Sequence, residues 1–417
     1  MKITGIIAEY NPFHNGHAYH LRQAKEISGA DFCLVVMGGD FMQRGTPAII
    51  DKYARTRMAL SGGADLVLEL PLYYAAGSAE FFAMGAVSLL DRLGAVDSLC
   101  FGSEWGSLSL LSQIAALLTR EPEEYRLALQ EGLKKGLSFP LARSLALQQS
   151  LPGSSGLQAV LSTPNNILGI EYLKALQRRH SSISPCTISR IGSGYHAAAL
   201  SSGDDTFSSA SAIRRSIHDP AAIRSHVPPA VYEILQKARQ KTFPISSKDF
   251  SLLLRYRLLT EAEKGCAGYL DMPPGLAGKI RKHFNQFRDF EQFAGLLKSK
   301  ELTYSRICRS LLHILLDMTE EDMAAFRRED YVFYARILGF RRSSLKLLQV
   351  LKQNTSIPLI SKLADASSYL TGTGLTMLKK DIEAAHIYES VVSSKYGLPF
   401  ANEYSRELVI LEEPPMP

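Results

Sequence analysis

The sequence predicts an α/β protein in which a doubly wound parallel-sheet domain is followed by an all-helical domain. Three observations lead to this class. Strand-length apolar runs alternate with helical patterns over the first part of the chain, which is typical of a parallel sheet. The runs are continuously apolar, so each strand should be buried on both faces. From about Asp249 onward only helical periodicity is visible.

Five apolar runs of strand length determine where a site can lie. They are Ile3–Ala8, Phe32–Met37, Leu66–Leu70, Ser98–Phe101 and Cys186–Ile191. Helical patterns occupy Tyr53–Leu60 and Glu80–Leu93 between them. Sheets of this kind bind ligands at the carboxyl ends of their strands, so the loops after the strands are the places to look for chemistry.

The middle of the chain contains two further helix starts. Thr163 could cap a helix with Pro164 at its first position. After the fifth strand, a Gly/Ser/Asp-rich loop from Gly192 to Asp205 leads to a possible helix N-terminus at Ser209–Arg215. A chain of 417 residues is too long for one ordinary core, so we expect a catalytic domain over residues 1–240 and a second domain over residues 241–417.

Composition excludes several classes of protein. The hydrophobic fraction of 46% and the charged fraction of 21% are ordinary for a globular protein. The apolar opening reaches Glu9 too soon for a signal peptide, and no later apolar run could cross a bilayer, so we expect a cytoplasmic protein without a membrane partner. The five scattered cysteines contain no Cys-x-x-Cys pair, which argues against disulfides and against a zinc site.

The turn after the first strand carries the strongest chemical signal. Glu9–His17 runs from that strand into a helical pattern, so His14 and His17 flank a helix N-terminus. Unpaired backbone N–H groups and the positive end of the helix dipole make such a turn an anion site, and Gly16 lets a phosphate approach closely. The two histidines could donate to phosphate oxygens and stabilise departing pyrophosphate.

A metal site is the competing interpretation of this turn. His14, His17 and His20 form a His-x-x-His-x-x-His series. On a helix the third residue rotates away from the first, and no Cys or Asp lies among them, so we expect no metal here. From the residues alone, His20 is most simply a helix residue.

Several motifs together resemble a known group of enzymes. Asn11–His17 resembles the His-x-Gly-His signature of the nucleotidyltransferase superfamily, and Ser209–Arg214 resembles its later Ser/Thr-x-x-Arg phosphate motif. Across essentially the whole chain the sequence is most similar to one family, the tRNA(Met) cytidine acetate ligases. The blocks that carry this resemblance are Gly5–His17, Val36–Gly45, Phe101–Glu104 and Pro164–Leu168.

The resemblance implies a nucleotidyltransferase-like (Rossmann-like) catalytic domain and an ATP-dependent ligase. Such an enzyme activates acetate as acetyl-adenylate with release of pyrophosphate. It then acetylates the exocyclic amine of the wobble cytidine of elongator tRNA(Met) to give N4-acetylcytidine. Mg²⁺ is expected with ATP as its usual counterion. A small-metabolite adenylyltransferase is the alternative; it explains His14 and His17 but leaves the basic helical part of the chain unused.

The resemblance also implies which residues contact ATP, with His14 and His17 as the catalytic pair. The implied ATP site comprises Ile7, Ala8, Glu9, Tyr10, Asn11, Pro12, Phe13, His14, Asn15, Gly16, His17, Ala18, Tyr19, His20, Gly102, Asn165 and Arg190. Asn165 lies near a helix start and could cap that helix instead.

Four further residues are candidates for phosphate or acetate: Asp40, Arg44, Ser211 and Arg214. Asp40 and Arg44 belong to the Gly-rich segment after the second strand, at the ligand edge of the sheet. An equally good interpretation is a structural turn, with Asp40 as a cap and Arg44 on the surface. No paired carboxylates are visible in the sequence, so it assigns no general base.

A basic stretch with interleaved aromatic residues runs from Lys279 to Lys346. This composition suits contact with a nucleic-acid backbone, although helical domains often expose lysine and bury aromatics for structural reasons alone. The candidate tRNA-binding residues are Lys279, Arg281, Lys282, Arg306, Arg309, Arg341 and Arg342. The sequence says nothing of the oligomeric state.

Overall fold

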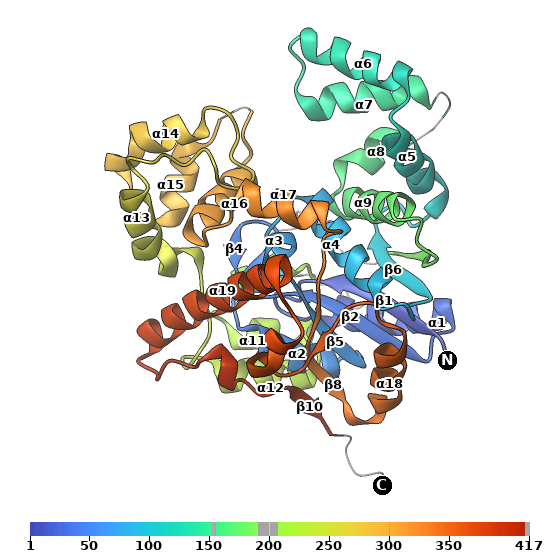
Figure 1. Ribbon diagram of the computed structural model, residues 1–417, viewed down its shortest axis with the longest axis vertical. Helices are drawn as coiled ribbons and strands as arrows, with labels where there is room; N and C mark the ends of the chain where they lie inside the picture. Colours follow the sequence, from blue (N-terminus) through green and yellow to red (C-terminus); the bar gives the residue numbers. More distant parts are fainter. Residues whose placement is uncertain (152, 154–155, 191–199, 201–206, 300, 413–417) are drawn as a thin grey trace.

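A single mixed sheet forms the centre of the computed structural model, with the strand order β10-β8-β5-β2-β1-β6-β7 and with β9 paired to β8. The structure describes residues 1–151, 153, 156–190, 200, 207–299 and 301–412. The loop predicted from Gly192 to Asp205 therefore lies outside the described residues, apart from residue 200. Figure 1 shows helices packed around this sheet, with further helices extending from it.

The five strands predicted from apolar runs are confirmed, and they are parallel. They are β1 (Ile3–Ala8), β2 (Phe32–Gly38), β5 (Leu66–Leu70), β6 (Ser98–Ser103) and β7 (Ser184–Ser189). Between β2 and β5, the short strands β3 (Phe41–Met42) and β4 (Thr46–Pro47) form an antiparallel hairpin. The parallel class follows from continuous burial, since most of the residues of β1, β2, β5 and β6 are buried.

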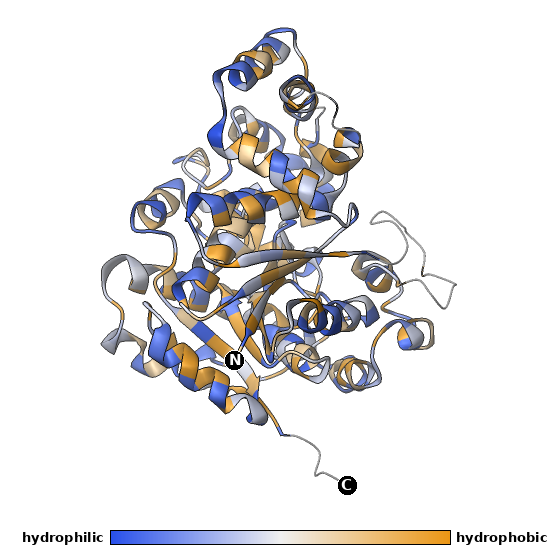
Figure 2. Cartoon of the chain, turned by 90° about the vertical axis from the view of Figure 1, so that its right-hand side faces the viewer, coloured by the Kyte–Doolittle hydropathy of each residue, from blue (hydrophilic) through white to orange (hydrophobic). Residues whose placement is uncertain are grey.

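Helices cover both faces of the sheet, which makes it doubly wound. One face carries α1 (Asn15–Ser28), α2 (Lys52–Ser61) and α12 (Pro229–Ala238); the other carries α4 (Ala79–Arg92), α5 (Leu108–Arg120) and α9 (Pro164–Arg178). Side chains of β1 point to both faces of the sheet. Ile3 packs in the core with α4 and α9, whereas Ile6 packs in the core with α1 and α2. The strands at the centre of Figure 2 are accordingly coloured mainly as hydrophobic.

The strand order reverses at one place in the sheet. From β1 the chain proceeds through β2 and β5 on one side, and then crosses to β6 and β7 on the other side of β1. At such a switch point the loops after the two central strands diverge and leave a crevice at their carboxyl ends. The crevice here lies between the ends of β1 and β6.

The region after residue 240 is mainly helical, as expected, but it also contributes to the sheet. Its helices are α13 (Ser251–Thr260), α14 (Leu276–His283), α15 (Phe290–Leu297), α16 (Tyr304–Leu315), α17 (Glu320–Arg328), α18 (Leu345–Asn354) and α19 (Gly372–Tyr396). The expectation of an all-helical region missed three strands: β8 (Ala335–Arg341), β9 (Leu359–Ile360) and β10 (Val409–Leu411). β8 lies antiparallel beside β5, with Glu69 opposite Arg336.

The reason that β8 escaped prediction is the arginine at its second position. Arg336 is 4% exposed, and its guanidinium pairs with Glu69 of β5 at 2.9 Å. This neutralisation depends on a partner that is remote in sequence, so local composition suggested a charged surface and not a buried strand.

A second group of helices extends from the β6 side. It contains α5 together with α6 (Glu123–Lys134), α7 (Phe139–Ser150) and α8 (Leu157–Ser162). In Figure 1 the α6–α7 pair projects at the upper right, whereas α13 to α16 lie at the upper left. Among the described residues, no helix combines the length and the apolar character that crossing a membrane requires.

Candidate active site

A cavity of about 260 Å³ opens at the switch point of the sheet. Its walls come from the ends of β1, β6 and β7, from α1, α4 and α9, and from the β3–β4 hairpin and the start of α10 (Ala210–Arg215). The lining residues are Ile7, Ala8, Glu9, Tyr10, Asn11, His14, Gly16, His17, Tyr19, His20, Gln43, Arg44, Phe82, Phe101, Gly102, Asn165, Leu168, Tyr172, Ile188, Ser189, Arg190, Phe207, Ser208, Ser209, Ala210, Ser211 and Arg214.

Most of the residues that the resemblance assigned to ATP line this cavity, and four do not: Pro12, Phe13, Asn15 and Ala18. Phe13 is fully buried behind the turn, where its ring fills the space beside Gly62 at the end of α2. The Asn15 side chain donates to the carbonyl of Ser225, 2.8 Å away. These side chains hold the turn in place from the side opposite the cavity.

His14 and His17 build the start of α1 through reciprocal hydrogen bonds. His14 is the N-cap, and its Nδ1 accepts from the N–H of Gly16 at 3.1 Å. His17 Nδ1 accepts from the N–H of His14 at 3.2 Å. A nitrogen that accepts carries no proton, so the proton of each neutral ring sits on Nε2. The backbone therefore fixes both histidines as Nε2–H donors.

Both histidines are held neutral by their surroundings. Burial lowers the pKa of His14 to about 3, assisted by the positive charges of Arg190 and Arg214. Burial likewise lowers the pKa of His17 well below its ordinary value, with further contributions from His14, Arg190 and His20. At neutral pH the pair thus supplies hydrogen-bond donors without adding charge, and the positive charge of the site comes from arginine.

His20 also lines the cavity, although the residues alone suggested a simple helix position. Its Nε2 is buried and has no hydrogen-bond partner among the described residues. Burial, with the charge of Arg190, lowers its pKa to about 4. A buried polar atom of this kind is costly unless a ligand or water satisfies it, so a ligand contact at His20 explains the arrangement.

Two arginines face the histidine turn, Arg190 after β7 and Arg214 on α10. Arg214 donates to the carbonyl of Asn11 at 2.7 Å and to Ser211 Oγ at 3.0 Å, which ties α10 to the turn. Arg190 follows β7, and its side chain passes Gly102, where an added Cβ would lie 3.5 Å from Arg190 Cγ. Guanidinium groups suit phosphate recognition because their donors match its oxygens in geometry and charge.

Asn165 is oriented by a carboxylate of the neighbouring loop. Its side-chain nitrogen donates to Glu104 Oε1 at 2.5 Å, and the backbone N–H of Asn166 donates to Glu104 Oε2 at 3.1 Å. The helix cap is Thr163, so the capping role considered for Asn165 is wrong. Glu104 instead holds the amide of Asn165 on the cavity wall.

The β3–β4 hairpin brings two residues to the cavity: Gln43, which the sequence analysis missed, and Arg44, which it proposed. The N–H of Gln43 donates to Glu9 Oε1 at 2.8 Å, while the Gln43 side-chain nitrogen is buried without a partner among the described residues. Arg44 lines the cavity beside it. Phe82 and Tyr172 reach the site from helices that pack over the switch point, a relationship that carries no local sequence signal.

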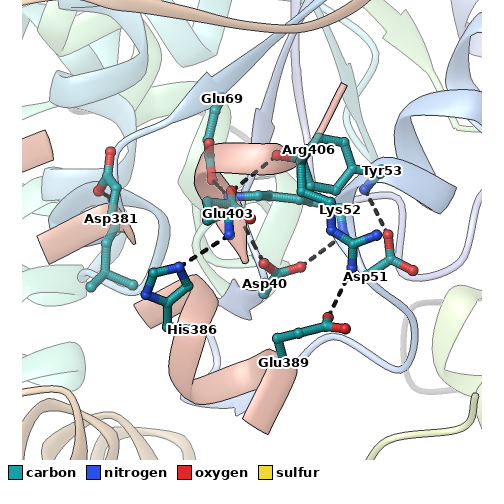
Figure 3. Close-up of polar contacts among 12 residues, drawn as sticks. Asp40, Asp51, Lys52, Tyr53, Glu69, Asp381, His386, Glu389, Glu403 and Arg406 are labelled. Carbon is teal, nitrogen blue, oxygen red and sulfur yellow. Dashed lines mark hydrogen bonds and ion pairs between the residues drawn. The ribbon is translucent and has the colours of Figure 1, made fainter. Parts of the chain in front are cut away.

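Asp40 does not line the cavity, and the structural alternative considered for it fits. Its Oδ1 accepts from the N–H of Lys52 at 2.7 Å, and Lys52 Nζ lies 3.9 Å from Oδ2. Burial raises the pKa of Asp40 to about 7. Lys52 also pairs with Glu69 at 2.8 Å and with Glu403 at 2.5 Å, so Asp40 belongs to a buried charge cluster, drawn in Figure 3.

The candidate tRNA-binding residues fall into three groups in the structure. Lys279, Arg281 and Lys282 lie on α14, where the last two are exposed. Arg306 and Arg309 both pair with Asp271, at 3.3 and 3.0 Å.

Arg341 and Arg342 lie elsewhere. Arg341 is the last residue of β8 and Arg342 follows it, and the N–H of Arg341 donates to the carbonyl of Asp65. Because β8 is antiparallel to β5, this is the edge of the sheet opposite the cavity. The seven residues therefore do not form one surface.

Within the described ranges, no group of three His, Cys, Asp or Glu side chains could hold a metal ion. Around the histidine turn the candidate site offers hydrogen-bond donors and guanidinium groups, with Glu9 as a carboxylate on the same cavity. Such a set matches a polyphosphate ligand.

Comparison with known proteins gives the family. The sequence model of the family described as "HIGH Nucleotidyl Transferase" matches residues 1–399. A tRNA(Met) cytidine acetate ligase of Thermoanaerobacter sp. is 43% identical over 96% of this chain and 98% of its own. The chain belongs to the tRNA(Met) cytidine acetate ligase family. A further member, from Acetivibrio thermocellus, is 39% identical over 99% of this chain and all of its own.

Solved structures of the same family share the fold. Thermotoga maritima TmcAL in its apo form I has a TM-score of 0.92 to this chain, with 31% identity over 99% of this chain and 100% of the other. The same protein bound with alpha-thio ATP has a TM-score of 0.89. The nucleotidyltransferase-like fold expected from the family resemblance is therefore confirmed.

Proposed function

We propose that this protein is an ATP-dependent tRNA(Met) cytidine acetate ligase. The observation that carries the proposal is the pair of neutral Nε2–H donors, His14 and His17, at the N-terminus of α1, with Arg190 and Arg214 on the same cavity. This arrangement suits the triphosphate of ATP. The ligase relatives match nearly the whole chain, which supports this reading over a small-metabolite adenylyltransferase.

In the first half-reaction, an acetate oxygen attacks the α-phosphorus of ATP. A new P–O bond forms, and the bond to the bridging oxygen breaks so that pyrophosphate leaves with the electron pair. We expect the Nε2–H groups of His14 and His17 to donate to phosphate oxygens as their charge grows, with Arg190 and Arg214 neutralising it. Mg²⁺ would arrive with the ATP phosphates, and we assign it no protein ligand.

The remaining residues of the site take roles around this reaction. Glu9 to Asn11, Gly102 and Asn165 line the cavity where the rest of the nucleotide would bind. Arg44 and Gln43, on the β3–β4 hairpin, are the candidates for the acetate carboxylate. Ser211 shares a hydrogen bond with Arg214 and would position it.

For the tRNA we propose a contact surface on α14, formed by Lys279, Arg281 and Lys282. The helical region lies at the ligand edge of the sheet, since the backbone of Arg309 in α16 packs directly against Gly45 of the β3–β4 hairpin. A tRNA bound to this region would therefore be near the cavity. We propose residues 1–240 as the main catalytic part and residues 241–417 as the tRNA-binding part, acting in the cytoplasm.

The test is ATP–pyrophosphate exchange with and without acetate, followed by transfer of labelled acetate to total tRNA. Acetate-dependent exchange and label at a cytidine are expected. Exchange that responds to another acid or to a phosphorylated metabolite, but not to acetate, would establish the adenylyltransferase alternative instead.

A further inference from the structure

The second half-reaction needs a proton acceptor that the first does not. When the exocyclic amine attacks the acetyl carbonyl carbon, a C–N bond forms and the bond from that carbon to the adenylate oxygen breaks. AMP leaves with the electron pair, and the amine nitrogen must lose one proton. A positioned base commonly accelerates such a step by about 10²–10⁴-fold. This inference rests on the proposed function.

The histidines of the turn are unsuited to this task. The Nδ1 atoms of His14 and His17 already accept backbone N–H groups, and their Nε2 atoms carry the protons. Neither ring therefore has a lone pair to offer. Arg190 and Arg214 are donors only.

Glu9 has the required chemistry. It is the one carboxylate among the described residues that line the cavity. Its Oε1 accepts from the N–H of Gln43 at 2.8 Å, and Oε2 makes no hydrogen bond within the described part of the chain. A carboxylate with one anchored and one unoccupied oxygen is both oriented and able to accept a proton.

The backbone around Glu9 is also fixed. Its carbonyl accepts from Arg55 Nη1 at 2.8 Å, and the same nitrogen donates to the carbonyl of Gly38 at 3.0 Å. Arg55 is fully buried, so it joins the ends of β1 and β2 beneath the cavity. Glu9 thus stands at a defined place on the same turn that carries His14 and His17, as a preorganised group should.

We propose that Glu9 is the general base of the acetyl-transfer step. Its Oε2 takes the proton from the exocyclic amine of cytidine as the C–N bond forms, while the histidine pair keeps its hydrogen bonds to the adenylate phosphate. The departing phosphate of AMP is the competing acceptor, and the experiment separates the two.

The experiment measures the two half-reactions separately in the full-length enzyme and in Glu9→Gln. Glutamine keeps an oxygen for the N–H of Gln43 but is not a base. In Glu9→Gln we expect single-turnover transfer from preformed acetyl-adenylate to tRNA to fall by about 10²-fold more than acetate-dependent ATP–pyrophosphate exchange does. Glu9→Asp should retain part of the transfer rate. Glu26→Gln, an exposed change on α1, is the matched control.

Three outcomes would count against the inference or its basis. Unchanged transfer in Glu9→Gln would show that AMP or solvent accepts the proton. Equal losses in both half-reactions would place Glu9 in ATP activation. Absence of acetate-dependent exchange in the parent enzyme would overturn the proposed function itself.

Discussion

His14 and His17 lie stacked at the start of α1, with ring centroids 3.6 Å apart and ring planes 23° from parallel. Repulsion between like charges at this distance disfavours protonation of both rings, in agreement with their lowered pKa values. The pair acts as a double donor whose direction is set by the backbone.

Loss of the donors should slow adenylate formation. We expect His17→Ala and His14→Asn each to lower the rate of acetate-dependent ATP–pyrophosphate exchange by about 10²–10³-fold, as the loss of one transition-state donor does. Asparagine at position 14 still caps α1, so helix loss does not confound that variant. Filter binding should show unchanged tRNA affinity. A drop in both the exchange rate and the tRNA affinity would mean that the turn has unfolded.

Reversing two surface charges on α14 should weaken tRNA binding and leave ATP–pyrophosphate exchange unchanged. We expect Arg281→Glu with Lys282→Glu to weaken tRNA binding and to reduce its salt dependence by roughly one unit of slope per lost phosphate contact. ATP–pyrophosphate exchange should not change. The matched control is Arg342→Glu, an exposed arginine at the opposite edge of the sheet. If Arg342→Glu weakened tRNA binding equally, the α14 surface would not be the tRNA contact.

The buried charge cluster beneath the site should matter for stability. Glu403 pairs with Lys52 at 2.5 Å and with Arg336 at 2.8 Å. Glu403→Ala would remove one of the two carboxylates, Glu69 and Glu403, that both cations share, so we expect a loss of about 3–5 kcal/mol in the free energy of unfolding, measured by urea denaturation. Arg342→Gln, which breaks an exposed pair with Glu412, should cost about 0–1 kcal/mol.

The same carboxylate should also shape acid unfolding. The charges of Lys52 and Arg336 outweigh burial and lower the pKa of Glu403 from 4.5 to about 2. A lowered pKa stabilises the folded state above the ordinary value, and this contribution is lost as the pH falls from 4.5 towards 2. The lowered pKa of Glu403 contributes about 3 kcal/mol to the free energy of unfolding. The difference in unfolding free energy between the parent and Glu403→Gln should therefore shrink over that window, and a constant difference would contradict the assignment.

Much of the sheet could be predicted because its signal is local. Runs such as Ile3–Ala8 and Leu66–Leu70 are buried on both faces, so their composition alone identifies them. β8 could not be found this way, since the burial of Arg336 depends on Glu69 of a strand more than 250 residues earlier in the sequence. Tyr334 and Phe340, two aromatic residues of the basic stretch, are buried as well.

The site was predictable to the extent that it follows strand ends. The turn from Glu9 to His17 and the residues Gly102 and Arg190 were expected there, and all of them except Pro12, Phe13 and Asn15 line the cavity. Gln43 could have been found from its place after the second strand. Phe82 and Tyr172 could not, since they reach the cavity only through the packing of α4 and α9. For Asp40 the sequence left a ligand role and a structural cap equally open, because its contacts with Lys52 are visible only in three dimensions.

The contact between the first strands and the last part of the chain has a consequence for synthesis. Tyr53 and Glu403, which share a hydrogen bond, are separated by 350 residues. At ribosomal speeds of about 5–20 residues per second, Glu403 is made roughly 20–70 s after Lys52. During that interval Lys52 has Glu69 but not Glu403 as its partner, and β5 lacks its neighbour β8. The charge cluster and the pairing of β5 can therefore be completed only after nearly the whole chain has been made.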